Sequence, residues 1–231
     1  MNLITKKLVE QYLEDDRTTH WLDKFSTSKD EEYTCQKWLR ESSAKRYIFD
    51  VLYGDLIEGK QNKRILDVGG GVTAFSTVLA SSHEYVLCEL LAHDDIERVS
   101  KLADATGRDF VRVQDWWTLE DNNYDLVIAN DLFPNADQRI EMFLEKFLPR
   151  CARARVLLTW YDEPRHYMVR RVDADEIMSI LAWNGSQVKE VLEKYVSKIV
   201  SPDLSIFNRE NQSVYPNGRQ TCVVEFEGDL R

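Results

Sequence analysis

The sequence is poor in glycine and proline, and it shows neither an internal repeat nor a low-complexity segment. Nine glycines and five prolines in 231 residues leave little room for flexible linkers. Apolar residues make up 43% of the chain, close to the share in globular proteins, so a continuous core is expected. Length and composition together predict one full domain with an extension.

Cysteine is also scarce, and its four copies lie far apart in the sequence. Cys35, Cys88, Cys151 and Cys222 form no C-x-x-C pair. This spacing indicates neither a zinc site nor a thiol-disulfide motif. We therefore expect free thiols in a reducing compartment, and no bound metal.

Long apolar runs are absent as well. Charged residues such as Lys6, Lys7 and Glu10 interrupt every apolar stretch near the start of the chain, so no secretory signal is indicated. No segment approaches the roughly 18 apolar residues typical of a membrane-spanning helix. We expect a cytoplasmic protein without a membrane partner.

Positive charge is in deficit. Thirty Lys and Arg residues face 40 Asp and Glu residues, which gives a net charge of −10 at pH 7. Nucleic-acid affinity comes largely from Lys and Arg that neutralise phosphates. The balance therefore argues against DNA as a partner, while it leaves a local basic patch open. It does not indicate an oligomeric state.

Apolar periodicity divides the chain near residue 60. Residues 1–60 are helical in pattern and rich in aromatic side chains, and Gly59 is a suitable helix end. From Arg64 onward, short strand-like runs alternate with helical patterns. Such alternation predicts an α/β domain with a parallel sheet covered on both faces. We expect a helical extension or lid over residues 1–60 and the sheet domain over residues 61–231.

The alternating region contains five strand-like runs. They cover residues 64–68, 85–88, 110–113, 124–129 and 155–161. Helical patterns follow most of these runs, and the pattern after the fifth carries Ile177, Ile180 and Leu181. Near the C-terminal end, residues 195–200 and 221–226 are predicted to pair antiparallel at the sheet edge.

The most informative stretch is residues 65–74, where an apolar strand leads into three glycines and then into a helix. Gly69, Gly70 and Gly71 permit a sharp turn and leave no Cβ between the backbone and a ligand. The N–H groups at the start of the helix then face an anionic or polar ligand group. This arrangement predicts a site for a nucleotide-type cofactor.

Two cofactor classes fit the glycine loop. Gly69, Gly71 and Ala74 match the dinucleotide fingerprint G-x-G-x-x-A, and Glu89 lies at a spacing suited to a ribose diol. Asp67, however, precedes the first glycine by two residues, where we expect its carboxylate to repel a pyrophosphate. A cationic, phosphate-free cofactor suits this position better than a dinucleotide does.

Residues 64–160 resemble the class I S-adenosylmethionine-dependent methyltransferases. Asp67 and the glycine-rich turn that follows match the first motif of the family, with Thr73 where many members have a further glycine. Glu89 matches the acid that binds the ribose hydroxyls. Asp115 matches the polar residue that meets the adenine amino group.

The resemblance implies a Rossmann-like sheet of seven mostly parallel strands, helices on both faces and an antiparallel strand pair near the C-terminal end. It also implies S-adenosylmethionine as the cofactor. Residues 124–131 resemble the fourth strand, which ends at the active site in Asn130 and Asp131. No adjacent prolines follow, unlike in the amino-methyltransferases of nucleic-acid bases, so a DNA substrate is further disfavoured.

The candidate site residues fall into three groups. Cofactor contacts are expected from Asp67, Gly69, Gly70, Gly71, Glu89, Asp115, Trp116 and Asn130. Asp131 or His166 is expected to orient the acceptor or remove its proton, because an unperturbed histidine pKa near 6.5 suits a general base. Acceptor contacts are expected from Trp21, Tyr33, Tyr161 and Arg165. Packing in the core is the alternative for Trp21, Tyr33 and Trp116, and for Tyr161 and Arg165 the alternative is a surface loop.

We therefore predict a methyltransferase that transfers a methyl group to a small polar acceptor, at nitrogen or oxygen rather than carbon. One alternative is a methyltransferase-like subunit that binds S-adenosylmethionine without catalysis. An NAD(P)-dependent oxidoreductase is less favoured, because no second substrate domain follows the sheet.

Overall fold

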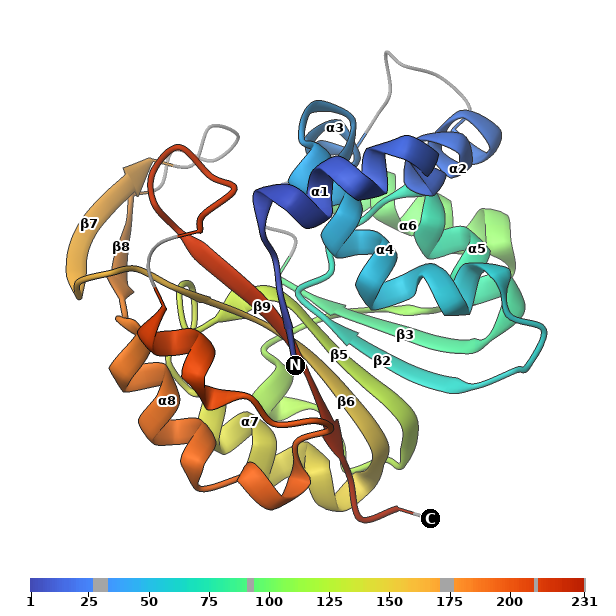
Figure 1. Cartoon of the computed structure of the whole chain (residues 1–231). Coiled ribbons are helices and arrows are strands. Elements are labelled where there is room, and N and C mark those ends of the chain that lie inside the picture. Colours follow the sequence, from blue (N-terminus) through green and yellow to red (C-terminus); the bar gives the residue numbers. More distant parts are fainter. Residues whose placement is uncertain (27–32, 91–93, 171–176, 210–211, 231) are drawn as a thin grey trace.

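A seven-stranded sheet crosses the middle of the molecule in the order β1-β9-β6-β5-β2-β3-β4 (Figure 1). The computed structural model describes residues 1–26, 33–90, 94–170, 177–209 and 212–230. The strands of the sheet are β1 (Asn2–Leu3), β2 (Arg64–Val68), β3 (Glu84–Glu89), β4 (Val111–Val113), β5 (Tyr124–Phe133), β6 (Cys151–Trp160) and β9 (Gln220–Glu227). β2 to β6 are parallel, whereas β9 runs antiparallel to both β6 and β1. The predicted Rossmann-like α/β fold, with a mostly parallel sheet, is confirmed.

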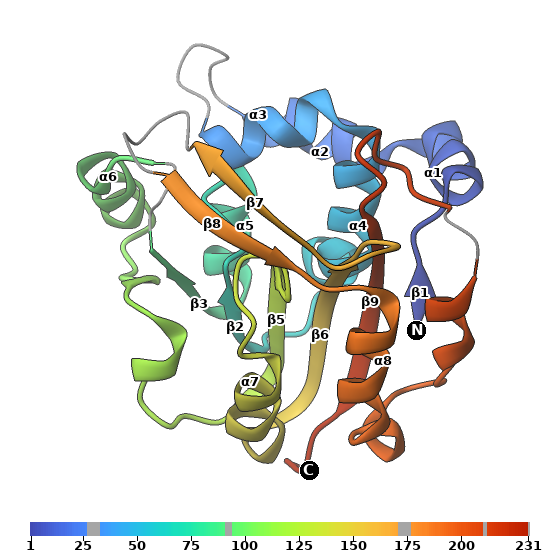
Figure 2. The same cartoon turned by 90° about the vertical axis from the view of Figure 1, so that its left-hand side faces the viewer.

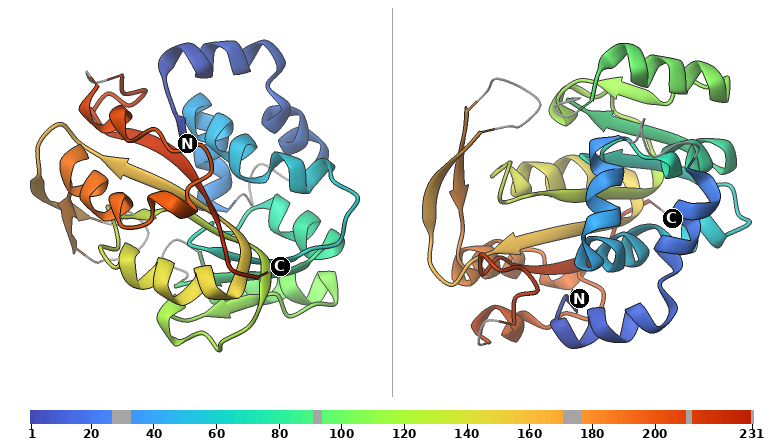
Figure 3. Two further views of the ribbon diagram at one scale, coloured as in Figure 1. Left: turned by 60° about the horizontal axis from the view of Figure 1, so that its bottom comes forward. Right: turned by 90° about the horizontal axis from the view of Figure 1, so that it is seen from above.

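Helices cover both faces of this sheet (Figure 3). One face carries α4 (Ser43–Glu58), α5 (Ala74–Ser82) and α6 (Ile96–Thr106), and the other carries α7 (Ile140–Phe147) and α8 (Gly185–Glu193). Strand side chains alternate between the two layers, so Leu66 and Val68 pack toward α7 and α8 while Ile65 packs toward α4 and α5. Two apolar clusters therefore hold the carboxyl ends of the strands in place.

The N-terminal region contributes α1 (Lys6–Tyr12), α2 (Arg17–Phe25) and α3 (Thr34–Glu41) in addition to β1 and α4. Ser42 caps α4 by accepting from the Lys45 N–H, and the helix ends before Gly59 as predicted. Its buried face packs on the sheet through Ile48 and Leu52. Short 3₁₀ turns complete the chain at η1 (Leu13–Asp15), η2 (Trp116–Thr118), η3 (Leu148–Arg150), η4 (Val196–Lys198) and η5 (Leu204–Asn208).

The helix predicted around residue 180 is wrong. This segment is strand β8 (Ile177–Ala182), which pairs antiparallel with β7 (Arg165–Arg170) in a separate hairpin. Ile177 and Leu181 point to the exposed face and Ile180 to the buried one. The three apolar residues thus fit a helical spacing although they occupy two faces of a strand. Seen from the side, the hairpin crosses in front of the central strands (Figure 2).

The strand predicted over residues 195–200 is also not formed. The backbone continues from α8 into 3₁₀ turns, where the Lys198 N–H donates to the Tyr195 carbonyl. Only Ile199 forms an isolated bridge to β9. β9 itself lies as predicted, and its outer neighbour is β1, paired through Asn2 and Leu3.

Candidate functional site

A cavity of about 820 Å³ opens at the carboxyl ends of the parallel strands. Its volume lies within the range of ~300–1,000 Å³ typical of small-molecule sites. Gly69 and Gly70 from the glycine loop, Glu89 from the end of β3, and Asn130 and Asp131 from β5 belong to its wall. The fold thus brings together residues from three strands at the edge where open α/β sheets bind ligands.

The glycine loop is shaped by contacts within the protein. Gly69 and Gly71 both have φ of +71°, in the left-handed region that favours glycine. A Cβ on Gly71 would collide with the Cys35 sulfur on α3, and a Cβ on Gly70 would collide with the Asp67 carboxylate. Two of the three glycines are therefore required by packing, whatever ligand the loop faces.

Protein acceptors already occupy several N–H groups of the loop and of the first turn of α5. The Gly71 N–H donates to Glu89 Oε2 at 3.3 Å, and the Ala74 N–H donates to Gln36 Oε1 at 2.7 Å. Thr73 and Ser76 form a capping box over the same helix end. A pyrophosphate binds through N–H groups of this kind, so it would have to displace these acceptors.

Asp67 lies behind the loop rather than in the cavity wall. It is 2% exposed, and its two carboxylate oxygens accept hydrogen bonds from Tyr53 Oη at 3.0 Å and Tyr85 Oη at 2.7 Å. Burial raises the pKa of Asp67 to about 7, although both tyrosine hydroxyls act to lower it. Direct repulsion of a pyrophosphate by Asp67, as expected from the sequence, does not follow from this position. The occupied N–H groups distinguish the cofactor classes instead.

Glu89 is a predicted cofactor residue whose side chain belongs to the cavity wall. Besides Gly71, its carboxylate accepts from the Leu90 N–H at 2.9 Å through Oε1. These two backbone contacts hold the carboxylate at the mouth of the cavity, where Leu90 is also part of the wall. The arrangement can accept hydrogen bonds from ligand hydroxyls.

A bulge in β5 exposes the residues at its carboxyl end. The register with β6 shifts between Ala129 and Phe133, and Asp131 has φ of 54°. Asp131 accepts from Arg219 Nη1 at 3.0 Å and lies 3.7 Å from Lys45 Nζ. Sequence reasoning missed both cations, and two positive side chains hold this carboxylate in place.

Two solved structures match the chain over most of its length. The DhpI–SAH complex is 14% identical with a TM-score of 0.50, covering 96% of this chain and 98% of that chain. Burkholderia thailandensis 1,6-didemethyltoxoflavin-N1-methyltransferase, with bound 1,6-didemethyltoxoflavin and S-adenosylhomocysteine, is 13% identical with a TM-score of 0.51, covering 96% and 90%. No protein-family model and no curated protein sequence matches the chain. The chain has the class I methyltransferase fold.

In this methyltransferase fold, Asp115 and Trp116 lie one layer behind the cavity wall. Asp115 accepts from Arg139 Nη2 at 2.8 Å, and the buried Trp116 donates from Nε1 to Asp137 at 2.9 Å. The Arg139 guanidinium lies 4.7 Å from the Trp116 ring centre. Asp137 and Arg139 themselves belong to the wall. The sequence predicted the two supports and missed the two residues they position.

The Asp137 carboxylate remains charged in this arrangement. Burial acts to raise its pKa, but hydrogen bonds from Arg139 and Trp116 outweigh that effect and hold the pKa below its ordinary value. In the sequence, Asp137 and Arg139 are marked only by their close spacing before α7. That spacing does not reveal Asp115 as a second partner of Arg139.

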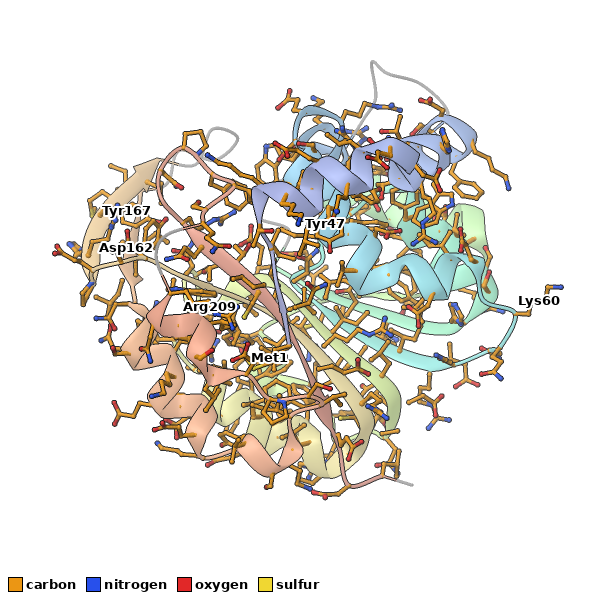
Figure 4. All side chains as sticks on the ribbon, in the orientation of Figure 1. Met1, Tyr47, Lys60, Asp162, Tyr167 and Arg209 are labelled. Atoms are coloured by element: carbon orange, nitrogen blue, oxygen red, sulfur yellow. The ribbon has the colours of Figure 1, made fainter. Side chains whose placement is uncertain are left out.

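The segment after β6 reaches the cavity through residues other than those predicted. Tyr161 is 2% exposed, and the Arg165 guanidinium stacks 4.1 Å from its ring centre. The hydroxyl of Tyr167, a residue labelled in Figure 4, lies 3.3 Å from the hydroxyl of Tyr161 and donates to Asn135 Oδ1 at 3.1 Å. Asn135 belongs to the wall, as does Val169 of the same hairpin.

His166 lies on the exposed face of the hairpin. Its Nε2 is 2.7 Å from Ser179 Oγ, and the strand register places it beside Leu181. The face that bears Val169 is the one toward the cavity. The catalytic role predicted for His166 stays a prediction, and this placement does not bring it to the other site residues.

The predicted N-terminal aromatics lie outside the cavity wall. Trp21 is 9% exposed and meets the Phe75 ring edge-on at 6.4 Å between centroids. Tyr33 lies beneath the Arg98 guanidinium at 4.4 Å. The same region instead contributes Trp38 to the wall, together with Lys45.

Three further features of the molecule concern metal ions, membranes and thiols. Among the residues that the structure describes, no group of three or more His, Cys, Asp or Glu side chains is placed to hold a metal ion. Within those residues, no helix is long and apolar enough to cross a membrane. The four cysteines are free thiols as predicted, and burial raises the pKa of Cys88 to about 12.

Proposed function

We propose that this protein is an S-adenosylmethionine-dependent methyltransferase that acts on a small polar acceptor at nitrogen or oxygen. Two observations together carry the proposal: the Gly71 and Ala74 N–H groups at the glycine loop already have protein acceptors, and the Glu89 carboxylate belongs to the cavity wall. A cofactor that has a ribose diol and no phosphate fits both features.

Different residues of the wall contact different parts of such a cofactor. Glu89 accepts hydrogen bonds from the ribose hydroxyls, and charge-assisted bonds of this kind contribute about 1.5–3 kcal/mol each. Gly69 and Gly70 allow close approach to the backbone, and Asn130 adds a polar contact from β5. Asp115 and Trp116 act through Arg139, which they hold against the wall.

The chemistry requires alignment above all. When bound, S-adenosylmethionine would supply a methyl group on a sulfonium. The acceptor atom would bond to the methyl carbon as the carbon–sulfur bond breaks, and the electron pair of the broken bond would stay on sulfur. The proton of the acceptor would pass to water. Fixed geometry in such a displacement is worth up to roughly 7–11 kcal/mol. Asp131, held by Arg219 and Lys45, serves to orient the acceptor.

A small acceptor and a cytoplasmic location complete the proposal. The toxoflavin enzyme, which is named for methylation at a nitrogen of a small molecule, supports an acceptor of this size. The net charge of −10 supports an acceptor other than DNA. Residues 1–60 contribute Trp38 and Lys45 to the wall, so we propose that they cover the cavity and take part in the choice of acceptor.

Calorimetry with S-adenosylmethionine, S-adenosylhomocysteine and NADH tests the cofactor. We expect binding of the first two, and we expect Glu89→Gln to weaken it roughly 10- to 100-fold because a charged acceptor of the ribose hydroxyls is lost. Glu84→Gln is the matched control, since Glu84 lies at the other end of β3 in an exposed pair with Arg64. Binding of NADH without S-adenosylmethionine would contradict the proposal.

A non-catalytic S-adenosylmethionine-binding subunit is the second candidate. It is favoured by the ion pairs of Asp131 with Arg219 and of Asp137 with Arg139, which engage two carboxylates of the wall. Radiolabelled methyl transfer to fractionated small metabolites separates the candidates. Cofactor binding without transfer to any fraction would support the binding subunit.

A further inference from the structure

The end of the cavity away from Glu89 carries a cluster of charges. Arg219 Nη1 donates to Asp131 Oδ1 at 3.0 Å and to Oδ2 at 3.3 Å, and Lys45 Nζ lies 3.7 Å from Oδ2. All three side chains belong to the cavity wall. Two cations therefore share one carboxylate, which leaves one positive charge in excess in a chain whose net charge is −10.

The Arg219 guanidinium is held firmly but incompletely satisfied. Its side chain is 13% exposed and stacks 4.4 Å from the Tyr215 ring centre. Nη1 is bonded to Asp131, and the buried Nε has no acceptor among the described residues. A guanidinium carries five N–H donors, more than its contacts with Asp131 use, so an acceptor in the cavity would complete the cluster from the side that Arg219 presents to the wall. A planar guanidinium matches a carboxylate in two-point geometry.

The position of the cluster separates it from the proposed ribose site. Arg219 immediately precedes β9, while Glu89 ends β3, and the sheet order puts β6, β5 and β2 between those strands. Both cations meet at Asp131 on β5, and two strand spacings of about 4.8 Å, roughly 10 Å in all, separate β5 from the strand that ends in Glu89. A cofactor held at Glu89 therefore leaves the cations on the acceptor side.

Aromatic and apolar surfaces border these cations. Lys45 Nζ lies 4.4 Å from the Trp38 ring centre, and Trp38, Tyr215 and Leu132 belong to the same wall. An acceptor that fills this end would place an apolar or aromatic body against the rings and an anionic group against Arg219.

We infer that Arg219 and Lys45 bind a carboxylate of the methyl acceptor, and that the acceptor is an aromatic or similarly apolar acid. This inference rests on the proposed function and narrows its substrate class. Asp131 is the residue that positions Arg219 and Lys45, because its two carboxylate oxygens hold both cations at the wall. Neutral analogues of the same shape lack the group that the excess positive charge recognises.

The test is a titration of the whole protein, saturated with S-adenosylhomocysteine, with three acids and their matched primary amides. The probes are benzoate, 4-hydroxybenzoate and phenylacetate. We expect at least one acid to bind at least 10-fold more tightly than its amide. Arg219→Gln should remove this preference, and Arg219→Lys should retain part of it.

Two further variants keep the test decisive. Lys45→Gln changes a more exposed side chain, 29% accessible, and should weaken acid binding about 3-fold even if the Arg219 variants fail to fold. Arg153→Gln removes the same charge from an exposed pair with Glu225 and Glu227 on the surface of β6 and β9, and should change nothing. Affinity for S-adenosylhomocysteine should stay constant throughout.

Three results would overturn the inference. The first is equal binding of acids and amides, and the second is saturable binding of none of the acids while S-adenosylhomocysteine binds. The third is weaker S-adenosylhomocysteine binding in Arg219→Gln with unchanged binding of 5′-methylthioadenosine, which lacks the amino-acid carboxylate; this would assign the cations to the cofactor. Wild-type protein that binds no S-adenosylhomocysteine would instead contradict the proposed function itself.

Discussion

The two ends of the cavity are built in different ways. The glycine-loop end comes mainly from one continuous stretch, β2, the loop, α5 and β3, to which α3 adds contacts from Cys35 and Gln36. Glu89 contacts a loop N–H only 18 residues earlier in the chain. The opposite end joins Lys45, Asp131 and Arg219, and the Asp131–Arg219 contact spans 88 residues. A local motif therefore encodes the first end, which we call the continuous end. The second, which we call the assembled end, exists only after the chain has folded.

Gly71→Ala should have the largest effect and acts on the continuous end. The left-handed φ costs an alanine ~1–2 kcal/mol, and the collision with Cys35 adds ~1–3 kcal/mol of overpacking. Urea denaturation measures the loss of unfolding free energy. Gly107→Ala is the control, because Gly107 has φ of +65° and nothing within 4 Å of the added Cβ. Equal losses in the two variants would show that α3 does not constrain the loop.

Asp67→Asn should flatten the pH dependence of stability. The pKa of Asp67 is raised from 3.8 to about 7, so its stabilising contribution as the neutral acid is complete below pH 4 and is lost as the pH rises through 7. The shift corresponds to at most ~4 kcal/mol. Denaturation at pH 4 to 8 should show wild type losing stability relative to the variant. Asp109→Asn, at an exposed site, should follow wild type; parallel curves for all three proteins would refute the raised pKa.

Tyr167→Phe should affect the assembled end alone. It removes the hydrogen bond to Asn135, worth ~1 kcal/mol, and so frees the hairpin from the cavity wall. A loss of ~1 kcal/mol corresponds to about 5-fold weaker binding, so we expect acceptor binding to weaken by that factor. The affinity for S-adenosylhomocysteine should stay unchanged. Titrations of both ligands check this, with Tyr195→Phe, after α8, as the control. A change in cofactor affinity instead would mean that the two ends are not independent.

His166→Ala should have the smallest effect. Its side chain contacts Ser179 on the exposed face of the hairpin, so we expect turnover within 2-fold of wild type. The dependence of kcat/KM on pH between 5.5 and 8.5 should keep its shape. Loss of one limb of this pH profile would support the catalytic role predicted from the sequence and would extend the assembled end to the outer face of the hairpin.

The sequence predicted correctly those elements that a local pattern of apolar and turn residues marks. The five parallel strands, the loop and Glu89 follow from short-range patterns, since a strand, a turn and a helix each mark their own residues. It failed at β8, where Ile177, Ile180 and Leu181 satisfy a helical spacing although the residues lie on two faces of a strand. Short apolar runs carry this ambiguity by nature.

The cations of the assembled end left no signal of that kind. Arg219 stands in a loop after Asn217-Gly218, and its contact with Asp131 depends on the antiparallel return of β9 beside β6. Trp116 illustrates a further limit. A tryptophan beside a cofactor-type acid suggests a ligand contact, yet its ring is buried and it supports the wall through Arg139, which the ring contacts, and through Asp137, to which its N–H donates. Tertiary packing decides both cases.

The pairing of β1 with β9 has a consequence for synthesis. Asn2 and Leu3 pair with Val223 and Cys222, so a growing chain cannot complete this edge of the sheet until residues 222 and 223 have left the ribosome. Arg219 arrives in the same interval. The residues of the glycine-loop end therefore leave the ribosome before Arg219 does, so a ribosome stalled between them would hold a chain that lacks the charge cluster.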